Sequence, residues 1–386
     1  MLKYVDRKNT DCAKWDGLVG QFGEDDLLAM WVADMDFEEA DCIKKALIDY
    51  VEKVPFGYYS PRASYKEAFI DWEKKYHGYD IKPEWICFSP GIVAAFYWAM
   101  TMKTKPGDGV ILLSPIYYPM MNAIKYNERK LVMCDMIRTG NTYEVDFAKF
   151  EKDIVDNDVK VFILSSPHNP TGRIFTKEEL KCMLDICRKH GVFVISDEIH
   201  QDFEWNGHVH TPSALIGDYD DMMITMCAVS KTFNLAATQN SFIIIPDEKL
   251  REEYNTFARN INVTGGNAFG YVAVEAAIRE GRPWFEECKA QIWENYCYVK
   301  ETLEKETEIV VEDLQGTYLV WLDFGKYVKT QADIEEILQK KAKLAFDYGN
   351  WFGRGGDDFC QFGRMNLATS LENVKEACDR IIKAVK

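Results

Sequence analysis

Runs of apolar residues alternate with amphipathic stretches along most of the chain. Short runs that are apolar at nearly every position predict buried strands, and they occupy residues 85–89, 110–113, 160–165, 192–195, 222–229 and 242–245. Between them, residues 65–76 have the pattern of an amphipathic helix, and residues 92–105 have that of a buried helix. A further helix begins at the capping box Thr176-x-x-Glu179 and ends at His190-Gly191.

Short apolar strands that alternate with helices predict an α/β fold, with a mostly parallel sheet covered on both faces. In such sheets the polar residues that follow the strands converge at the carboxyl edge, where ligands bind. In this chain those residues are Gly91, Tyr117, Asn169, Asp197 and Lys231. We therefore expect a ligand site at this edge.

The pattern changes after residue 285. A long helical stretch runs to about residue 306, strands follow at 316–323 and 362–368, and further helices lie near 332–343 and at 372–385. Near the start, residues 31–37 have an extended pattern and a helix is expected after them. We predict a large α/β domain at residues 51–285 and a smaller α+β domain formed by residues 1–50 and 286–386.

The composition excludes several classes of protein. Of the 386 residues, 47% are hydrophobic, which favours a large packed core over disorder. The formal net charge of −16 repels phosphate backbones and anionic lipids. We therefore expect neither a nucleic acid nor a membrane as a partner.

The eleven cysteines are odd in number and contain no C-x-x-C pair, which favours reduced thiols over disulfides or a zinc site. Residues 1–6 contain no long apolar run. We expect a cytoplasmic protein. His208 and His210 have no cysteine or carboxylate close behind them, so we predict a surface loop there and no metal site.

Lys231 follows the apolar run 222–229, at the point where a buried strand should end. Apolar surroundings disfavour a charged amine, so the pKa of this lysine should fall and its amine become a nucleophile for an aldehyde. By itself this pattern more often belongs to a surface lysine whose charged end stays in water.

The neighbouring polar residues match the needs of a pyridine aldehyde cofactor. Such a cofactor needs a lysine for its aldehyde, a carboxylate for its ring nitrogen, a flat side chain against the ring, and a helix N-terminus for its phosphate. Lys231, Asp197, Tyr117 and the helix start at residues 91–93 supply these in turn, and Asn169 is a donor for the ring oxygen.

Three segments carry a family resemblance. SSPHNPTG at residues 165–172, SDEIH at 196–200 and SKTFN at 230–234 resemble the signature segments of fold-type I pyridoxal-phosphate enzymes, the class I/II aminotransferase superfamily. Their order fits, as do the spacings of 28 residues from Asn169 to Asp197 and of 34 from Asp197 to Lys231. The resemblance implies the aspartate aminotransferase fold and pyridoxal 5′-phosphate as cofactor.

Within that superfamily the chain is similar to the MalY/PatB group of carbon–sulfur β-lyases. The similar segments are WVADMDF at residues 31–37, FGY at 56–58, KTFNL at 231–235 and the Gly-rich FGRGG at 352–356, which Arg364-x-Asn366 follows. The resemblance implies a homodimer in which Tyr58 reaches the cofactor phosphate of the partner subunit.

The resemblance also implies a role for each matching position. The implied catalytic residues are Lys231, which would bind the aldehyde and take the substrate Cα proton, and Tyr118, which would act on the departing sulfur. The implied substrate-binding residues are Arg364, a clamp for the α-carboxylate, with Ala33 and Asn169. The implied cofactor-binding residues are Lys231, Asp197, Asn169, Tyr117, His200, Gly91, Ile92, Val93, Ser230 and Tyr58.

Four of these positions have a purely structural alternative. Tyr118 fits a packing aromatic, His200 a core histidine, and Tyr58 a surface residue; Arg364 fits an ion pair with an acid of the smaller domain.

The resemblance implies a C–S β-lyase that converts a sulfur amino acid, such as cystathionine, into pyruvate, ammonia and a thiol. Two alternatives stay open at this point. An aminotransferase would use the same lysine but need a keto acid acceptor, and a pyridoxal-phosphate-binding regulatory protein would hold the cofactor without turnover.

Overall fold

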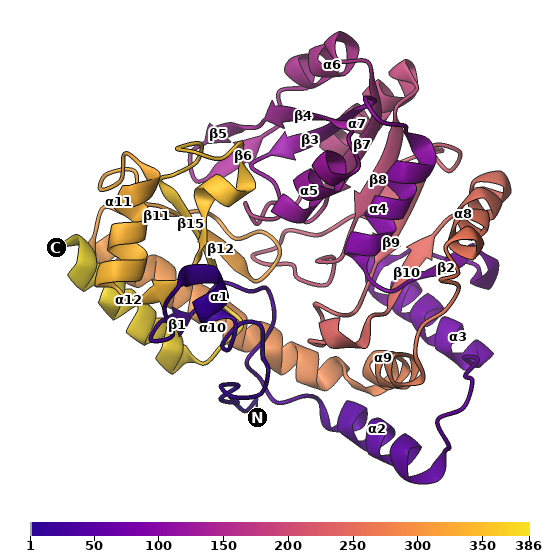
Figure 1. The fold of residues 1–386 in the computed structure, drawn as a ribbon, viewed down its shortest axis with the longest axis horizontal. Coiled ribbons are helices and arrows are strands. Elements are labelled where there is room, and N and C mark those ends of the chain that lie inside the picture. The colour runs from indigo at the N-terminus through magenta and orange to yellow at the C-terminus, as the bar shows by residue number, and fades with distance from the viewer. Residues whose placement is uncertain (1) are drawn as a thin grey trace.

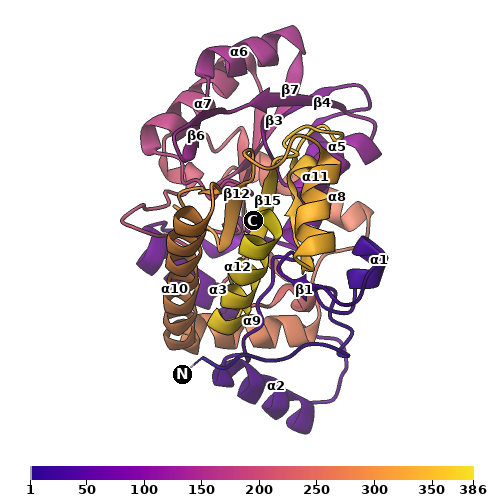
Figure 2. The ribbon, with the colours of Figure 1, turned by 90° about the vertical axis from the view of Figure 1, so that its left-hand side faces the viewer.

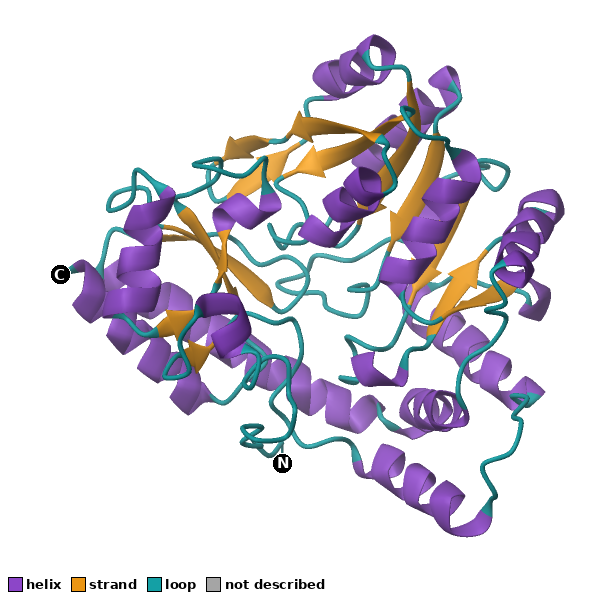
Figure 3. Ribbon diagram, viewed as in Figure 1, coloured by secondary structure: helices purple, strands orange, loops and turns teal. Residues whose placement is uncertain are grey.

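The computed structural model describes residues 2–386, and its centre is a seven-stranded sheet (Figures 1 and 3). The strands lie in the order β2-β10-β9-β8-β7-β3-β4, and all run parallel except β10, which is antiparallel to both neighbours. Their bounds are β2 Ile86–Ser89, β3 Gly109–Ser114, β4 Lys130–Asp135, β7 Val159–Ser165, β8 Phe193–Asp197, β9 Met223–Cys227 and β10 Ser241–Ile244.

Helices cover both faces of this sheet. Along β3, Val110 and Leu112 pack with residues of α4, α5 and α8, whereas Ile111 and Leu113 pack with residues of α6 and α7. This alternation explains why the strand is apolar at every position, since both of its faces are buried. The bounds are α4 Ile92–Lys103, α5 Tyr118–Tyr126, α6 Phe147–Asp156, α7 Lys177–His190 and α8 Glu248–Asn260.

A second, antiparallel sheet of four strands lies at the left of Figure 1, in the order β11-β12-β15-β14. Helices α10 and α12 pack side by side against each other, as Figure 2 shows. The bounds are β11 Val310–Val311, β12 Leu319–Asp323, β14 Asp347–Tyr348, β15 Phe362–Asn366, α10 Arg282–Glu306, α11 Gln331–Glu335 and α12 Leu371–Val385.

The remaining elements are short pairs and connecting helices. Strand β1 pairs in parallel with β13, and β5 pairs with β6 as a hairpin. Their bounds are α1 Leu18–Phe22, β1 Leu28–Ala29, α2 Asp41–Lys53, α3 Ala63–Trp72, β5 Ile137–Thr139, β6 Thr142–Glu144, α9 Ala268–Glu280 and β13 Leu344–Ala345. One hydrophobic cluster joins residues of α3, α9, α10 and the smaller sheet. We retain the division at residues 50/51 and 285/286 as a proposal.

Most predicted elements are present, and three differ. Within residues 31–37, predicted to be extended, residues 32–34 form bends and Phe37 makes a single antiparallel bridge with Tyr4, whereas the strand pairing nearby belongs to β1. The helix predicted at 65–76 ends as α3 at Trp72 and continues as a π-helical turn, Glu73–His77. The helix predicted near 332–343 divides in the same way, into α11 and a π-helical turn at Glu336–Lys341.

A buried ion pair holds the N-terminal segment in place. The Lys14 ammonium lies 2.6 Å from the Asp36 carboxylate, and neither side chain is exposed. The indole of Trp15 also donates to Asp36, at 3.0 Å. Because Asp36 ends the loop of residues 31–36, these contacts fix that loop against the rest of the protein.

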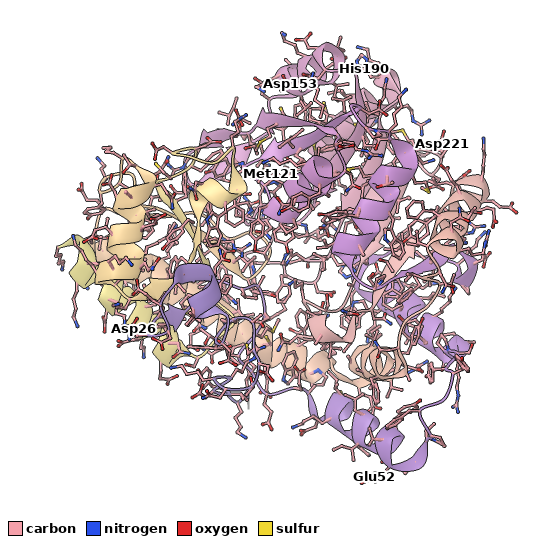
Figure 4. All side chains as sticks on the ribbon, in the orientation of Figure 1. Asp26, Glu52, Met121, Asp153, His190 and Asp221 are labelled. Carbon is pink, nitrogen blue, oxygen red and sulfur yellow. The ribbon has the colours of Figure 1, made fainter. Side chains whose placement is uncertain are left out.

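Charged residues such as Glu52, Asp153 and Asp221 lie at the outside of the molecule in Figure 4, whereas Met121 lies nearer its middle. Met121 is 3% exposed and belongs to the core on one face of the large sheet. In the part of the chain that the structure describes, no helix is both long and apolar enough to span a membrane.

The Lys14–Asp36 pair gives a stability prediction. Replacing Lys14 with Met removes the nearer cation of the buried Asp36 carboxylate and leaves it with the Arg7 guanidinium at 3.5 Å, which should lower the free energy of unfolding by about 3 kcal/mol. Urea unfolding followed by circular dichroism measures the change. As a control, Lys181→Met removes an exposed pair with Asp185 and should leave the midpoint unchanged. Equal midpoints for the two variants would contradict this account.

Candidate active site

A cavity lies at the carboxyl edge of the large sheet, where the sequence predicts a ligand site. Of the predicted site residues, those that line it are Ala33, Gly91, Ile92, Val93, Tyr117, Asn169, Asp197, His200, Ser230 and Lys231. Tyr58, Tyr118 and Arg364 are not among the lining residues. The structure therefore brings ten predicted residues together around one space.

The strands deliver these residues to one edge. Strand β7 ends at Ser165 and β8 at Asp197, and these two residues lie opposite each other in the sheet. Strand β9 ends at Cys227, shortly before Lys231. Because parallel strands share a direction, residues that follow them along the chain meet at the same edge.

The Lys231 side chain is half-buried and lines the cavity. Its ammonium donates to the Ala33 carbonyl at 2.6 Å. The loss of hydration in this enclosed position lowers the pKa of Lys231 to about 8; the Asp34 carboxylate opposes this shift and the Arg364 guanidinium adds to it. A substantial fraction of the amine is therefore neutral, and nucleophilic, near neutral pH.

Asp197 is 5% exposed, and its carboxylate accepts a hydrogen bond from the Ile199 amide at 3.1 Å. Burial raises the pKa of Asp197 to about 7, and the neighbouring Glu198 carboxylate adds to the shift. A cation bound beside it would favour the ionised form. The residue is therefore suited to pair with a protonated ring nitrogen.

Arg364 is almost completely buried and already has partners. It lies opposite Asp347 in the β14–β15 pairing and forms an ion pair with that carboxylate. It also donates to the Asn169 side-chain oxygen at 2.8 Å and to the Trp31 carbonyl at 3.2 Å. The predicted alternative, an ion pair with an acid, is thus present, and the substrate clamp stays a prediction. Burial raises the pKa of Asp347 to about 6.

Asn169 links Arg364 to the cavity. It is 4% exposed and lines the cavity. Because its side-chain oxygen accepts from Arg364, the amide nitrogen is the group that it can offer to a ligand.

The N-terminus of α4 forms one end of the cavity. Gly91 precedes the helix, and no side chain caps the first amides. Free amides and the helix dipole make such an end attractive to an anion. Ser230 also lines the cavity, and its hydroxyl is a further donor.

His200 is buried and lines the cavity. Burial lowers the pKa of His200 well below its usual value, and the positive charges of Lys231 and Arg364 lower it further. Its imidazole is therefore neutral. Its Nδ1 has no hydrogen-bond partner among residues 2–386, so a ligand can still bind there.

The three aromatic candidates are placed differently. Tyr117 lines the cavity, and its ring centroid lies 5.4 Å from that of Tyr118. Tyr118 packs edge-on against Trp351, at 6.2 Å. Tyr58 is fully exposed, in the loop before α3.

The family follows from comparison with known proteins. The aminotransferase class I and II family matches residues 26–381. The chain belongs to this family. It is 37% identical to cystathionine beta-lyase PatB of Bacillus subtilis (strain 168) over 385 residues, which cover 99% of each chain.

Solved structures of the family have the same fold. A PLP-bound putative aminotransferase from Clostridium difficile 630 has a TM-score of 0.95 and 37% identity, with 100% of this chain and 99% of that one covered. Cystalysin from Treponema denticola, which contains a pyridoxal 5′-phosphate cofactor, has a TM-score of 0.94 and 36% identity over 99% and 97% of the two chains. The fold class and the family group predicted from the sequence are confirmed.

One prediction about the surroundings was wrong. His208 is exposed as expected, but His210 is buried, and its ring nitrogen lies 3.1 Å from a Glu198 carboxylate oxygen. Glu198 directly follows β8. The local sequence around His210 gives no sign that this carboxylate lies beside the loop. Among residues 2–386, no group of three or more His, Cys, Asp or Glu side chains is arranged to hold a metal ion.

Sequence reasoning also missed cavity residues, among them Phe96, Ile199 and Asn240. Phe96 lies inside an apolar helix, where nothing in the sequence separates a cavity residue from a core residue. Asn240 lies two residues before the strand predicted at 242–245, and that position was its one signal in the sequence.

The charges around Lys231 give a testable prediction. In the cofactor-free protein its amine should titrate near pH 8, charged below and neutral above. Asp34→Asn removes a negative charge and should lower this pKa, whereas Arg364→Gln removes a positive charge and should raise it. Nitrogen-15 NMR of the lysine side chains measures the titration, with Lys231→Arg to assign the signal. A midpoint near 10.5, unmoved by either variant, would contradict the assignment.

Proposed function

We propose that the protein is a pyridoxal-phosphate-dependent C–S β-lyase that releases pyruvate, ammonia and a thiol from cystathionine or related cysteine S-conjugates. The observation that carries the proposal is the enclosed Lys231 amine in one cavity with the Asp197 carboxylate and the α4 N-terminus. The similarity to PatB over almost the whole chain supports the reaction type.

The cavity fits this cofactor at each of its functional groups. Lys231 is the amine for the aldehyde, and Asp197 is the carboxylate for the ring nitrogen. The α4 amides and Ser230 are donors for the phosphate. The unpartnered Nδ1 of His200 and the amide of Asn169 are available to the ring. Tyr117 supplies a flat side chain for the ring face.

When bound, pyridoxal phosphate withdraws electrons from the Cα atom of the amino acid attached to it. Arg364 and Ala33 orient the substrate α-carboxylate. The neutral Lys231 amine takes the proton from Cα, a task that suits a base with a pKa near 8. The thiolate then leaves from Cβ, and Tyr118 or protonated Lys231 returns a proton to the sulfur. Thiols are acidic, with a pKa of about 8.5, so little further assistance is needed.

An aminotransferase is the second candidate, because the similar Clostridium difficile structure is described as a putative aminotransferase. Both reactions use Lys231 to move the Cα proton. They differ in the step after that proton transfer, since only the lyase loses a group from Cβ.

We also propose a homodimer in which Tyr58 of each subunit reaches the cofactor phosphate of the other. Tyr58 is fully exposed and has no ring partner among the described aromatics. It lies in a patch of exposed apolar residues from α2, the following loop and α9. These residues are Ile48, Val51, Val54, Phe56, Tyr58, Tyr59 and Phe269. A surface of this kind favours burial against a second copy.

We propose a cytoplasmic location as well. All eleven cysteines are free thiols, and most of them are buried. A chain with this many unpaired thiols is suited to a reducing compartment.

The lyase proposal predicts pyruvate from cystathionine without added keto acid. Purified protein loaded with pyridoxal phosphate should form pyruvate, measured with lactate dehydrogenase and NADH. Lys231→Ala should lower the rate by at least about 100-fold, because the base is lost. Lys181→Ala, at an exposed position, should leave it unchanged.

The same assay separates the alternatives. Turnover that appears only with a keto acid acceptor would support the aminotransferase. Cofactor absorbance without turnover of any amino acid tested, with or without a keto acid, would contradict both enzymes.

The dimer proposal predicts complementation between two inactive subunits. A hybrid of one Lys231→Ala subunit and one Tyr58→Ala subunit has one site that receives both Lys231 and the partner's intact tyrosine. Activity of the isolated hybrid should therefore be about half that of the wild type. Activity no higher than that of the Tyr58→Ala dimer would show that Tyr58 does not act across the interface.

A further inference from the structure

The side chain of Asn240 carries a buried N–H donor, and no described residue accepts a hydrogen bond from it. The residue is 4% exposed and lines the cavity that contains Lys231. Its side-chain nitrogen is buried and has no hydrogen-bond partner among residues 2–386. Since buried polar groups in proteins are nearly always hydrogen-bonded, a buried donor left without a partner in a residue that lines a cavity indicates a missing acceptor.

Tyr65 fixes the orientation of this amide. Its hydroxyl donates to the Asn240 side-chain oxygen. Its ring is held in α3, stacked on Phe242 at 5.2 Å and edge-on to Tyr271 at 4.9 Å. Burial raises the pKa of Tyr65 well above its usual value, so the hydroxyl stays a donor. Because its oxygen already accepts from Tyr65, the group of Asn240 that is left without a partner among the described residues is the side-chain NH₂.

The sheet register places Asn240 at the phosphate end of the cavity. Ser241 pairs with Ser89 across β10 and β2, and a further bond from the Ser241 hydroxyl to the Ser89 carbonyl, at 2.8 Å, holds this end. Asn240, one residue before the paired stretch, therefore lies on the same edge as Gly91 and the start of α4. Asp197 ends β8, two strands away, or about 10 Å at ordinary strand spacing. An extended ligand can therefore reach from Asp197 to Asn240.

The donors at the Asn240 end of the cavity are neutral groups, and they suit an anion. Among the described lining residues, the charged side chains are Lys231 and Asp197, and both belong to strand ends other than β2 and β10. The α4 amides, the Ser230 hydroxyl and the Asn240 amide are thus the available donors. The helix dipole adds a partial positive charge to them.

We propose that Asn240 is a cofactor-binding residue whose amide donates to the phosphate of pyridoxal phosphate, with Tyr65 as its positioning residue. This rests on the proposed cofactor, and it assigns the phosphate site a side-chain donor beyond Ser230 and the partner's Tyr58. The phosphate is recognised by oriented N–H groups and a helix end. The aldehyde and the ring nitrogen are bound elsewhere in the cavity, so loss of Asn240 should affect only ligands that carry a phosphate.

The test compares pyridoxal phosphate with pyridoxal, which lacks the phosphate. Asn240→Asp keeps the shape and the acceptor for Tyr65 but replaces the donor with an acceptor. It should raise the dissociation constant for pyridoxal phosphate about 10- to 100-fold, the range for a charge-assisted hydrogen bond. The constant for pyridoxal should change by less than about twofold. Equilibrium dialysis of the cofactor-free protein measures both constants.

Two further variants extend the test. Asn206→Asp adds the same charge at an exposed turn and should change neither constant. Tyr65→Phe should lower the preference for the phosphorylated ligand while the thermal midpoint shows that the protein is folded. If Asn240→Asp does not fold, the double variant Tyr65→Phe/Asn240→Leu, which replaces both partners with apolar groups of similar shape, takes its place.

The outcomes separate this inference from the proposed function. An unchanged ratio of the two dissociation constants in folded Asn240→Asp, or in the double variant, overturns the inference and leaves the proposed function standing. A wild-type protein that binds neither ligand overturns the proposed function itself. A wild-type protein that does not prefer pyridoxal phosphate to pyridoxal also overturns the role of Asn240.

Discussion

The enclosed amine of Lys231 is the constraint on which the rest of the site depends. An amine withdrawn from water needs an acceptor, and it finds one in the Ala33 carbonyl at 2.6 Å. The same carbonyl accepts from the Tyr318 hydroxyl at 2.8 Å, and Arg364 donates to the neighbouring Trp31 carbonyl at 3.2 Å. The loop of residues 31–36 therefore connects the end of a large-sheet strand to the smaller sheet. The lysine and the arginine are placed relative to each other by the loop to which both donate.

Backbone hydrogen bonds hold that loop at Asp36, whose amide donates to the Ala368 carbonyl and whose carbonyl accepts from Val5, and side chains hold the part before it. Asn366 donates to the carbonyls of Val32 and Asp34, and the buried Lys14–Asp36 pair closes the end of the loop. Irregular backbone at a ligand site needs such support, because otherwise its polar groups would be buried unpaired. The smaller sheet thus contributes to the site through the loop that it holds, as well as through Arg364.

Two of the described residues that line the cavity have unpartnered polar atoms. The His200 Nδ1 and the Asn240 side-chain nitrogen are buried without partners among the described residues, and so is the Arg364 Nε close by. Buried polar groups without a hydrogen-bond partner lower the stability of the ligand-free protein. Proteins leave such groups unpaired mainly at sites where a ligand supplies the missing partner. The combination of a depressed lysine pKa and a raised aspartate pKa at one sheet edge has the same origin, since both result from burial.

The sequence by itself determined six of the seven strands of the large sheet, the capped helix α7 and the convergence of Asn169, Asp197 and Lys231, because continuous apolar runs and capping patterns are local and parallel strands share one edge. Tertiary structure alone decided that the 31–37 segment would bend over Lys231, a contact between residues 198 positions apart. It also decided that His210 would be buried on Glu198, and that Asn240 would line the cavity with its side-chain nitrogen left without a partner among the described residues. Such outcomes depend on which distant groups compete for each donor and acceptor, and local periodicity carries no information about that competition.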